Sequence, residues 1–213
     1  MKLRDSCNLA WVTPDAEQLI VKMARVSAPE NEDNLATAPR LLKYLIKHKH
    51  WSPFEMANMC VEIYTQRDIS AQIIRHRSFS FQEYSQRYAE TAQAPLPKFR
   101  RQDSHNRQNS FDDLTDEQQD MLEELTYRHI KEGHELYKTM LEMGVAKETA
   151  RRHLPMCSPT RIYMNGTVRS WIHYFENRTH PSTQYEHRTI ANQAKILFQQ
   201  NFPIISEALW YDT

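Results

Sequence analysis

The sequence predicts an α+β fold built as a single domain over residues 1–213. Segments with apolar residues at helical spacing occupy most of the chain, and the few strand-like segments do not alternate with them as βα units would. Hydrophobic residues make up 40% of the chain, which is enough for a sizeable core at this length. No internal repeat or low-complexity tract divides the chain.

Local patterns place the individual elements. Strands are expected where apolar and polar residues alternate, at 3–12, 59–65 and 161–164. Helices are expected where apolar residues recur every three or four positions after a capping residue. The expected caps are Thr13, Thr37, Ser52, Asp68, Thr115, Thr167 and Ser182. Ser52 with Glu55, and Thr115 with Gln118, have the spacing of a capping box.

The longest expected helix begins after Thr115 and is stopped by Gly144. Its apolar stripe predicts a buried face, belonging to the core or to a subunit interface, made of Leu122, Leu125, His129, Ile130, Gly133, Leu136, Tyr137 and Met140. Gly133 would let another helix approach closely there. Residues 92–112 are polar and weakly patterned, which indicates a long loop or excursion.

Composition excludes several classes of protein. The chain has 27 Lys and Arg and 27 Asp and Glu, so its formal net charge is 0, which argues against a globally basic nucleic-acid binder. The apolar runs are too short to span a membrane, and Arg4 and Asp5 stand where a signal peptide needs apolar residues. Three cysteines without a CxxC pair are typical of reduced thiols, so we expect a cytoplasmic protein.

Phosphate loops and metal sites are not expected either. The chain contains only 3 Gly, which excludes Gly-rich Walker and dinucleotide-binding loops. Any bound phosphate would then be held by side chains or helix N-termini. His173, His180 and His187 are spaced by seven across Pro181, whereas two metal ligands on one helix are spaced by four, so no metal is expected.

Two arginine-rich segments could carry chemistry. Residues 75–88 combine three arginines with interleaved aromatic residues, which would tether the guanidinium groups as a fixed anion site. Residues 151–188 contain six arginines and no lysine, and arginine is the residue suited to bidentate recognition. Arg169 and Arg178 are nine apart, so on one helix they face opposite sides. They cannot both contact one ligand unless the helix stops between them or two subunits meet there.

These segments match ordered motifs of a known family. Arg75-His76-Arg77, seven residues and then Ser85 resemble the RHR-x7-S signature of flavin-dependent thymidylate synthases. Further matches are Arg87 and Tyr88, the H-x-S-P-F-E segment at 50–55, Gln72, the E-x-A-R segment at 148–151, and 178–186. The resemblance covers most of the chain.

The resemblance implies a fold, a reaction and partners. The fold would have helices packed on a small, mostly antiparallel sheet, and the protein would be a homotetramer with FAD bound where subunits meet. The reaction would be reductive methylation of dUMP to dTMP. Methylenetetrahydrofolate would supply the carbon and NADPH would reduce the flavin. The family uses no Cys nucleophile. This agrees with the sequence, in which Cys60 lies in an expected strand and Cys7 and Cys157 have no paired base.

The resemblance also assigns residues. The dUMP-binding set is matched by Gln72, Arg75, Glu83, Ser85, Gln86, Arg87, Arg151 and Arg178. The FAD-binding set is matched by Ser52, Arg75, His76, Arg77, Glu83, Thr167, Arg169 and His173, and His50 matches a residue at the flavin or folate. His50 and Arg178 would be catalytic. The Arg178 guanidinium would stabilise the N3-deprotonated pyrimidine.

The sequence departs from the commonest family pattern at Thr167, His173 and Ser182, where Asn, Asn and His are usual. These changes affect contacts to flavin and folate and leave the RHR-x7-S motif intact. An alternative interpretation is a nucleotide- or RNA-binding module without catalysis, in which the same arginines and aromatic residues bind phosphates and stack on bases. The zero net charge argues against RNA as the main ligand.

Overall fold

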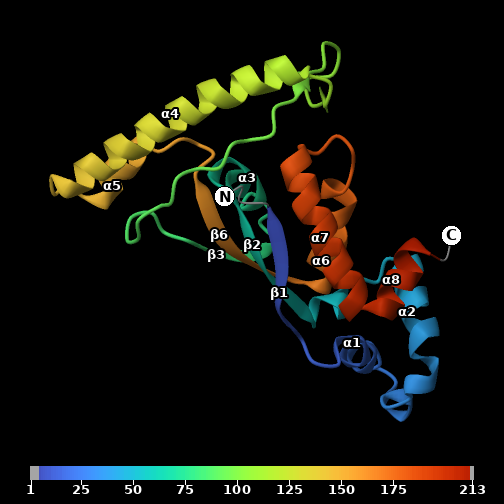
Figure 1. Ribbon diagram of the computed structural model, residues 1–213. Helices are drawn as coiled ribbons and strands as arrows, with labels where there is room; N and C mark the ends of the chain where they lie inside the picture. The colour runs from blue at the N-terminus through green and yellow to red at the C-terminus, as the bar shows by residue number, and fades with distance from the viewer. Residues whose placement is uncertain (1–4, 212–213) are drawn as a thin grey trace.

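A computed structural model describes residues 5–211. Its centre is a four-stranded antiparallel sheet of order β1-β2-β6-β3 (Figure 1). The strands are β1 (Ser6–Val12), β2 (Asn58–Gln66), β3 (Phe79–Glu83) and β6 (Pro159–Thr167). The α+β class predicted from the sequence patterns and the mostly antiparallel sheet implied by the family resemblance are confirmed.

Three of these strands agree with the sequence patterns. β2 and β6 contain the expected segments, and β1 matches the expected first strand from Ser6 onward; Asp5 precedes it, and Leu3 and Arg4 lie outside the described residues. On β6, Ile162 and Met164 are buried while Arg161 and Tyr163 are exposed, as expected for a sheet with one face on the core. β3 was not predicted as a strand, although Phe79-Ser80-Phe81 alternates, because it lies within the arginine-rich segment.

Helices α3, α6 and α7 pack against the sheet, and α1, α2 and α8 extend the core beyond it (Figure 1). The Trp171 indole on α6 is fully buried and donates to the Met59 carbonyl on β2 at 2.9 Å, which fixes α6 on the sheet. The helices are α1 (Ala16–Ala24), α2 (Ala38–Lys47), α3 (Arg67–Ile73), α4 (Asp116–Glu142), α5 (Lys147–Ala150), α6 (Val168–Arg178), α7 (Tyr185–Asn201) and α8 (Pro203–Trp210). The 3-10 turns are η1 (Pro29–Asn31), η2 (Leu35–Thr37), η3 (Ser52–Glu55) and η4 (Arg151–His153).

Two predicted caps are confirmed by hydrogen bonds. The Thr167 hydroxyl accepts from the Ser170 amide at the start of α6. Thr115 and Gln118 form a complete capping box at the start of α4. Thr37 occupies the N-cap position of α2 without capping it, because its hydroxyl accepts from Arg25.

Four predicted caps are wrong. The Thr13 hydroxyl accepts from the Asn58 amide and so joins the β1 end to β2, while α1 begins at Ala16. Ser52 makes no cap, because Glu55 instead pairs with Arg169. Asp68 lies inside α3, one residue after its start. Ser182 hydrogen-bonds to His180, and α7 begins three residues later, at Tyr185.

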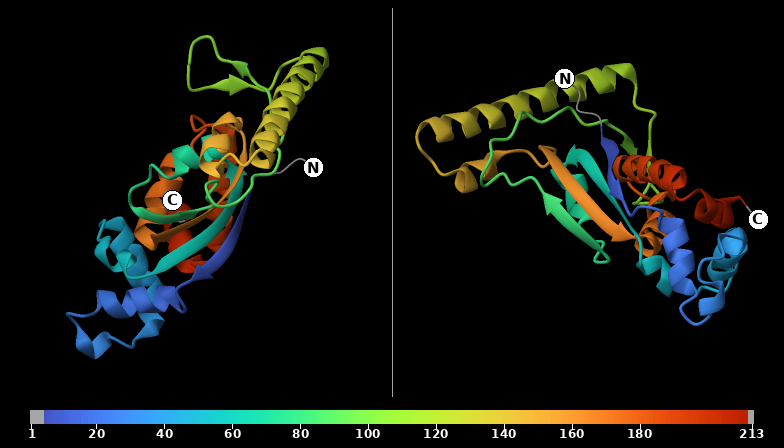
Figure 2. Two further views of the ribbon diagram at one scale, coloured as in Figure 1. Left: turned by 90° about the vertical axis from the view of Figure 1, so that its left-hand side faces the viewer. Right: turned by 90° about the horizontal axis from the view of Figure 1, so that it is seen from below.

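Helix α4 reaches away from the sheet, toward the end of the molecule opposite α1 and α2 (Figure 2). Only Ile130, His134 and Tyr137 are buried along it in one chain. The prediction of a continuous buried face therefore fails within one chain at Leu125, His129 and Leu136, which are exposed. Gly133 permits a close approach as expected, but to the His153 carbonyl of η4: an added Cβ would lie 3.2 Å from that oxygen.

The excursion at 92–112 contains a short hairpin, β4 (Arg101–Gln102) and β5 (Ser110–Phe111). Just before it, the Arg100 guanidinium makes two hydrogen bonds, of 2.8 and 2.9 Å, to the Glu186 carboxylate in the first turn of α7. Arg100 also lies over the Tyr185 ring. These contacts dock the excursion on the N-terminal end of α7. None of the helices within residues 5–211 is both long and apolar enough to cross a membrane.

Candidate functional site

The Arg178 guanidinium, at the C-terminal end of α6, contacts the middle residue of the RHR motif. Its Nε donates to His76 Nε2 at 2.8 Å, so His76 accepts and is neutral in this contact. Burial, and then the positive charges of Arg178 and His173, lower the pKa of His76 to about 4. A neutral histidine therefore holds Arg178 by one nitrogen and leaves its terminal nitrogens for a ligand.

His187 and Tyr174 pack against His76, the partner of Arg178. The His187 ring is fully buried, lies 3.0 Å from the Tyr174 hydroxyl and packs edge-on against His76. Burial, followed by the charges of Arg178 and His76, lowers the pKa of His187 to about 3. In the sequence, His187 is a candidate only as a metal ligand, and its burial beside His76 is not predicted, because a single histidine in a helix carries no signal of burial.

We expect the protein to lose stability as the pH falls below about 6.5, because His76 and His187 resist protonation only in the folded state. Between pH 6.5 and the folded pKa values the unfolded chain binds more protons. Each histidine then lowers the free energy of unfolding by up to about 1.4 kcal/mol per pH unit. Urea unfolding between pH 7 and pH 5 measures this slope. His187→Gln should reduce it, and an unchanged slope in that variant would contradict the assignment.

Arg178 lines a cavity of about 530 Å³ together with Gln72 of α3, and Gln72 hydrogen-bonds to Gln184 at 2.6 Å. Two residues of the predicted dUMP set are thus brought together from α3 and α6. The excursion also contributes to the lining, including Arg100 and Arg107. Sequence reasoning left these two arginines without a role, although the segment's density of arginines and amides was a usable signal.

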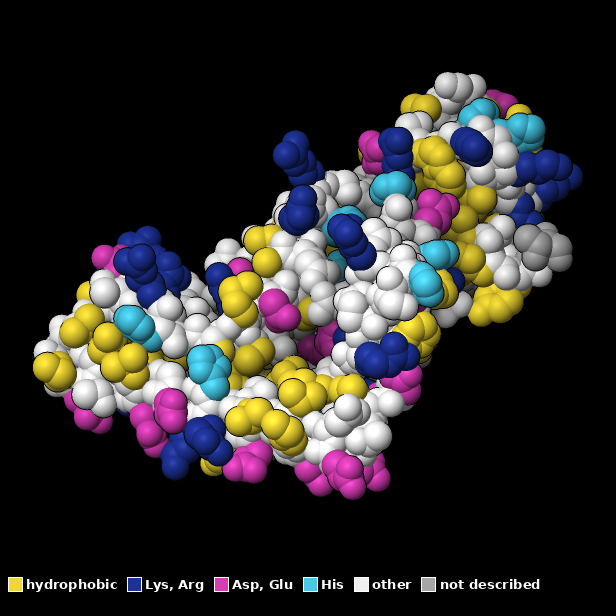
Figure 3. Space-filling view, turned by 90° about the horizontal axis from the view of Figure 1, so that it is seen from above, with side chains coloured by type: hydrophobic (Ala, Val, Ile, Leu, Met, Phe, Trp, Pro, Cys, Tyr) yellow, Lys and Arg dark blue, Asp and Glu magenta, His cyan; other side chains and the backbone are white. Residues whose placement is uncertain are grey.

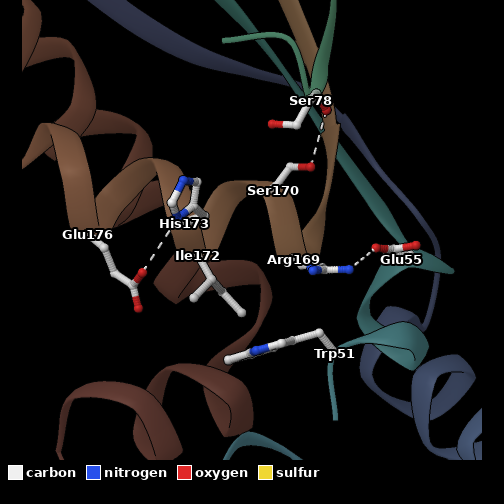
Figure 4. Close-up of a pocket in the computed structure, with 8 residues that line it drawn as sticks. All are labelled: Trp51, Glu55, Ser78, Arg169, Ser170, Ile172, His173 and Glu176. Carbon is white, nitrogen blue, oxygen red and sulfur yellow. Dashed lines mark hydrogen bonds and ion pairs between the residues drawn. The ribbon is translucent and has the colours of Figure 1, made fainter. Parts of the chain in front are cut away.

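Arg169 lines a different cavity, of about 400 Å³, on another side of α6 (Figure 4). Within one chain, Arg169 and Arg178 on α6 therefore line separate cavities, in agreement with the opposite sides expected from their spacing. His173 lies on the same wall as Arg169, and Trp51 extends along the floor (Figure 4). Arg169 is paired with Glu55, and His173 lies 3.7 Å from Glu176.

This cavity fits part of a flavin. Trp51 offers an aromatic face, and Arg169 and His173 offer nitrogens to an anionic or polar edge. Its volume is at the small end for a ligand site, so it can hold only a portion of a dinucleotide. Ser52 follows Trp51 directly and is exposed, and Thr167 is engaged as the α6 cap. His50 is exposed beside Tyr44 and lines neither cavity.

The two outer arginines of the RHR motif are exposed. Among residues 5–211, the side chains of Arg75 and Arg77 make no hydrogen bond or ion pair, so both remain available to a ligand. Glu83 is different, because its Oε1 atom accepts from Ser70 at 2.5 Å and from Thr160 at 2.9 Å and forms an ion pair with Arg67 at 2.9 Å. These three partners hold the Glu83 side chain in place at the end of β3.

Residues 85–87 form a turn beyond β3, on the side of the molecule that carries α5. The Arg87 guanidinium donates to Glu148 of α5, three residues before Arg151. Gln86 is buried, and its side-chain nitrogen has no partner among the described residues. The Ser85 hydroxyl accepts a long bond, 3.4 Å, from the Arg87 amide. Ser85, Gln86, Arg87 and Arg151 line neither of the two cavities, so one chain does not unite all the predicted site residues.

None of the three cysteines is activated. Burial raises the pKa of the Cys7 thiol to about 12 and also raises the pKa values of Cys60 and Cys157. A thiolate nucleophile therefore has no support in this structure. Within the part of the chain that is described, no three His, Cys, Asp or Glu side chains are grouped to hold a metal ion.

Comparison with known proteins decides the family. The family model described as "Thymidylate synthase complementing protein" matches residues 8–204. The chain is 51% identical to the "Probable flavin-dependent thymidylate synthase" of Paramecium bursaria Chlorella virus 1 over 195 residues, 91% of this chain and 90% of that protein. The chain belongs to the flavin-dependent thymidylate synthase family.

Other members of the flavin-dependent thymidylate synthase family agree with this assignment. The enzyme of that name from a Synechocystis species is 46% identical over 193 residues, covering 91% of this chain and 89% of its own. Among solved structures, the UMP/dUMP methylase PolB from Streptomyces cacaoi, bound with 5-Br dUMP, superposes with a TM-score of 0.86 at 26% identity. The similarity covers 98% of this chain and 96% of PolB.

Proposed function

We propose that this chain catalyses the reductive methylation of dUMP to dTMP. Methylenetetrahydrofolate gives the one-carbon unit and leaves as tetrahydrofolate, and NADPH provides the two electrons by way of bound FAD. The observation that carries the proposal is the cavity in which Arg178, held by a neutral His76, meets Gln72 with no carboxylate on its wall. The dUMP analogue in the PolB structure supports a pyrimidine nucleotide as the ligand.

Arg178 has the chemistry that activation of uracil needs. The C5 carbon is a poor nucleophile until negative charge develops on the ring through N3. A guanidinium fixed by His76 stabilises that charge with little reorganisation, because one of its nitrogens is already committed. The raised thiol pKa values support a route without attack by cysteine.

FAD, when bound, carries the electrons from NADPH. The residues of this chain that would hold it are Arg169 and His173, with Trp51 beside them in the cavity of Figure 4, and the uncommitted Arg75 and Arg77. Arg169 would have to share its carboxylate partner Glu55 or release it. Thr167 and His173 replace the usual Asn residues, and the cap made by Thr167 keeps the start of α6 fixed beside this cavity.

We propose that the enzyme assembles as a homotetramer of single-domain subunits in the cytoplasm. The exposed apolar side chains of α4 support an interface, and Figure 3 shows hydrophobic side chains on the surface at that end of the molecule. The exposed apolar side chains of α4 are Met121, Leu125, Tyr127 and Leu136. A second subunit could then bring its Ser85–Arg87 turn to the Arg178 cavity, which one chain does not do.

The test is purification of the full chain, followed by absorbance, light scattering and a dTMP-forming assay. We expect a yellow tetramer that converts dUMP to dTMP only with methylenetetrahydrofolate and NADPH present. A colourless monomer that takes up no added FAD would contradict the proposal. A protein that binds dUMP but forms no dTMP would favour the binding-module alternative.

We expect Ser85→Ala to weaken dUMP binding by roughly 1–2 kcal/mol, since a hydrogen bond to a charged phosphate is lost. The Ser85 hydroxyl has no His, Lys or carboxylate partner among residues 5–211, which supports a binding role over a nucleophilic one. Saturating dUMP should restore a measurable fraction of turnover, and Ser85→Cys should stay active. If Ser85→Ala keeps full dUMP affinity yet forms no dTMP at any concentration, the phosphate role is wrong.

A further inference from the structure

The hairpin in the excursion supplies one wall of the Arg178 cavity. Arg107 and Gln108, at the turn between β4 and β5, line it together with Gln72 and Arg178. The lining contains three arginines, with amide and hydroxyl side chains between them and no carboxylate. A wall with excess positive charge and many hydrogen-bond donors favours an anionic ligand.

The three arginines differ in the hydrogen bonds and ion pairs that they already make within the chain. Arg100 is neutralised by its two bonds to Glu186, and Arg178 is held through Nε by His76. The Arg107 guanidinium makes no hydrogen bond or ion pair with any residue between 5 and 211. Arg101, on the same hairpin, differs again, because it pairs with Asp113 and lies outside the cavity wall.

We propose that Arg107 binds the 5′-phosphate of dUMP, from the same subunit that supplies Arg178. This inference rests on the proposed function and adds a residue to its nucleotide site. A phosphate dianion is the strongest partner that a nucleotide offers to a free guanidinium, and the planar fork of arginine matches two phosphate oxygens. The cavity, at about 530 Å³, has the size of a site for a small ligand.

The contacts that hold the β4–β5 hairpin against α7 explain how the exposed Arg107 side chain can be positioned. Arg100 is fixed on α7 by Glu186, and the Asp103 carboxylate accepts from the amides of His105 and Asn106 and from the Asn109 side chain. These bonds order the turn on both sides of Arg107. With Ser85 and Arg87 brought by a neighbouring subunit, the phosphate would be held between two chains.

The test compares Arg107→Gln with wild type, both as FAD-loaded full-length protein. Calorimetric titration measures the Kd of dUMP and of deoxyuridine, which lacks the phosphate. We expect the Kd of dUMP to rise about 10- to 100-fold, the range for a lost charged hydrogen bond. The Kd of deoxyuridine should stay within about twofold. The Kd of dUMP for Arg107→Lys should lie between those of wild type and Arg107→Gln, because lysine keeps the positive charge but loses the planar two-point contact of arginine.

Arg101→Gln is the matched control: it removes the same group from the same hairpin without touching the cavity, and should bind dUMP as wild type does. An unchanged dUMP Kd in Arg107→Gln overturns the inference. So does a rise confined to the KM of methylenetetrahydrofolate, which would place Arg107 on the carboxylates of the folate. If Ser85→Ala and Arg178→Lys weaken dUMP binding while Arg107→Gln does not, only this inference fails. If wild type binds no dUMP, the proposed function fails with it.

Discussion

Gly166→Ala is expected to lower the free energy of unfolding by about 1–3 kcal/mol, the range for overpacking a filled core. Gly166 on β6 faces Phe79 on β3 in the sheet register. An added Cβ would overlap the Phe79 Cδ1 atom and lie 2.5 Å from its Cε1 atom. The ring cannot move aside cheaply, since it is buried and packs edge-on against Trp171 at 4.9 Å.

The effect should reach the arginine-rich segment, because Phe79 anchors the chain two residues after Arg77. Urea unfolding measures the loss of stability, and hydrogen exchange across 75–83 measures the loosening. Ser80→Ala, a neighbouring change on the exposed side of β3, is the control and should be near neutral. Phe79→Leu added to Gly166→Ala should recover part of the stability, as the smaller side chain gives the new methyl room. Gly166→Ala with wild-type stability would contradict the packing argument.

Local signals predicted those elements whose stabilising contacts are themselves local. Thr115 with Gln118, and Thr167, cap the helices that follow, within three residues. Thr13 and Ser52 have equally good local patterns and do not cap. Thr13 bonds to β2 instead, and Glu55, the expected partner of Ser52, pairs with Arg169, which is 114 residues away. Tertiary contacts decided these cases, and a single sequence does not show them.

The residues of the candidate site also divide into those that sequence motifs identified and those that only tertiary contacts bring together. The motifs identified Gln72 and Arg178, and the structure places both in one cavity. The His76 contact that orients Arg178 joins residues 102 apart, and no spacing rule predicts it. The docking of Arg100 on Glu186 spans 86 residues and turns a segment that looked like a loop into a wall of the cavity. The assignment of Ser85 and Arg87 to the same site still depends on a second subunit and stays a prediction.

Arg178→Lys is expected to cost about 1.5–3 kcal/mol in the dUMP-dependent half-reaction, the range for a hydrogen bond to a charged group. Lysine keeps the positive charge but loses the Nε–H that donates to His76 and the planar two-point contact with the pyrimidine. Rapid-mixing kinetics should show slower oxidation of the reduced flavin with dUMP and methylenetetrahydrofolate, by about 10- to 150-fold. Reduction of the flavin by NADPH alone should change much less, because Arg178 lines a different cavity from Arg169 and His173.

The control for this experiment is Arg152→Lys, an exposed arginine of η4 that lines neither cavity, and both half-reactions should keep wild-type rates. His76→Phe separates orientation from charge. It removes the neutral acceptor that holds Nε but keeps the Arg178 guanidinium, so it should slow the dUMP-dependent half-reaction less than Arg178→Lys does. Equal losses in both half-reactions of Arg178→Lys would mean that Arg178 supports the fold around His76 and His187, and that the pyrimidine charge is stabilised by another group.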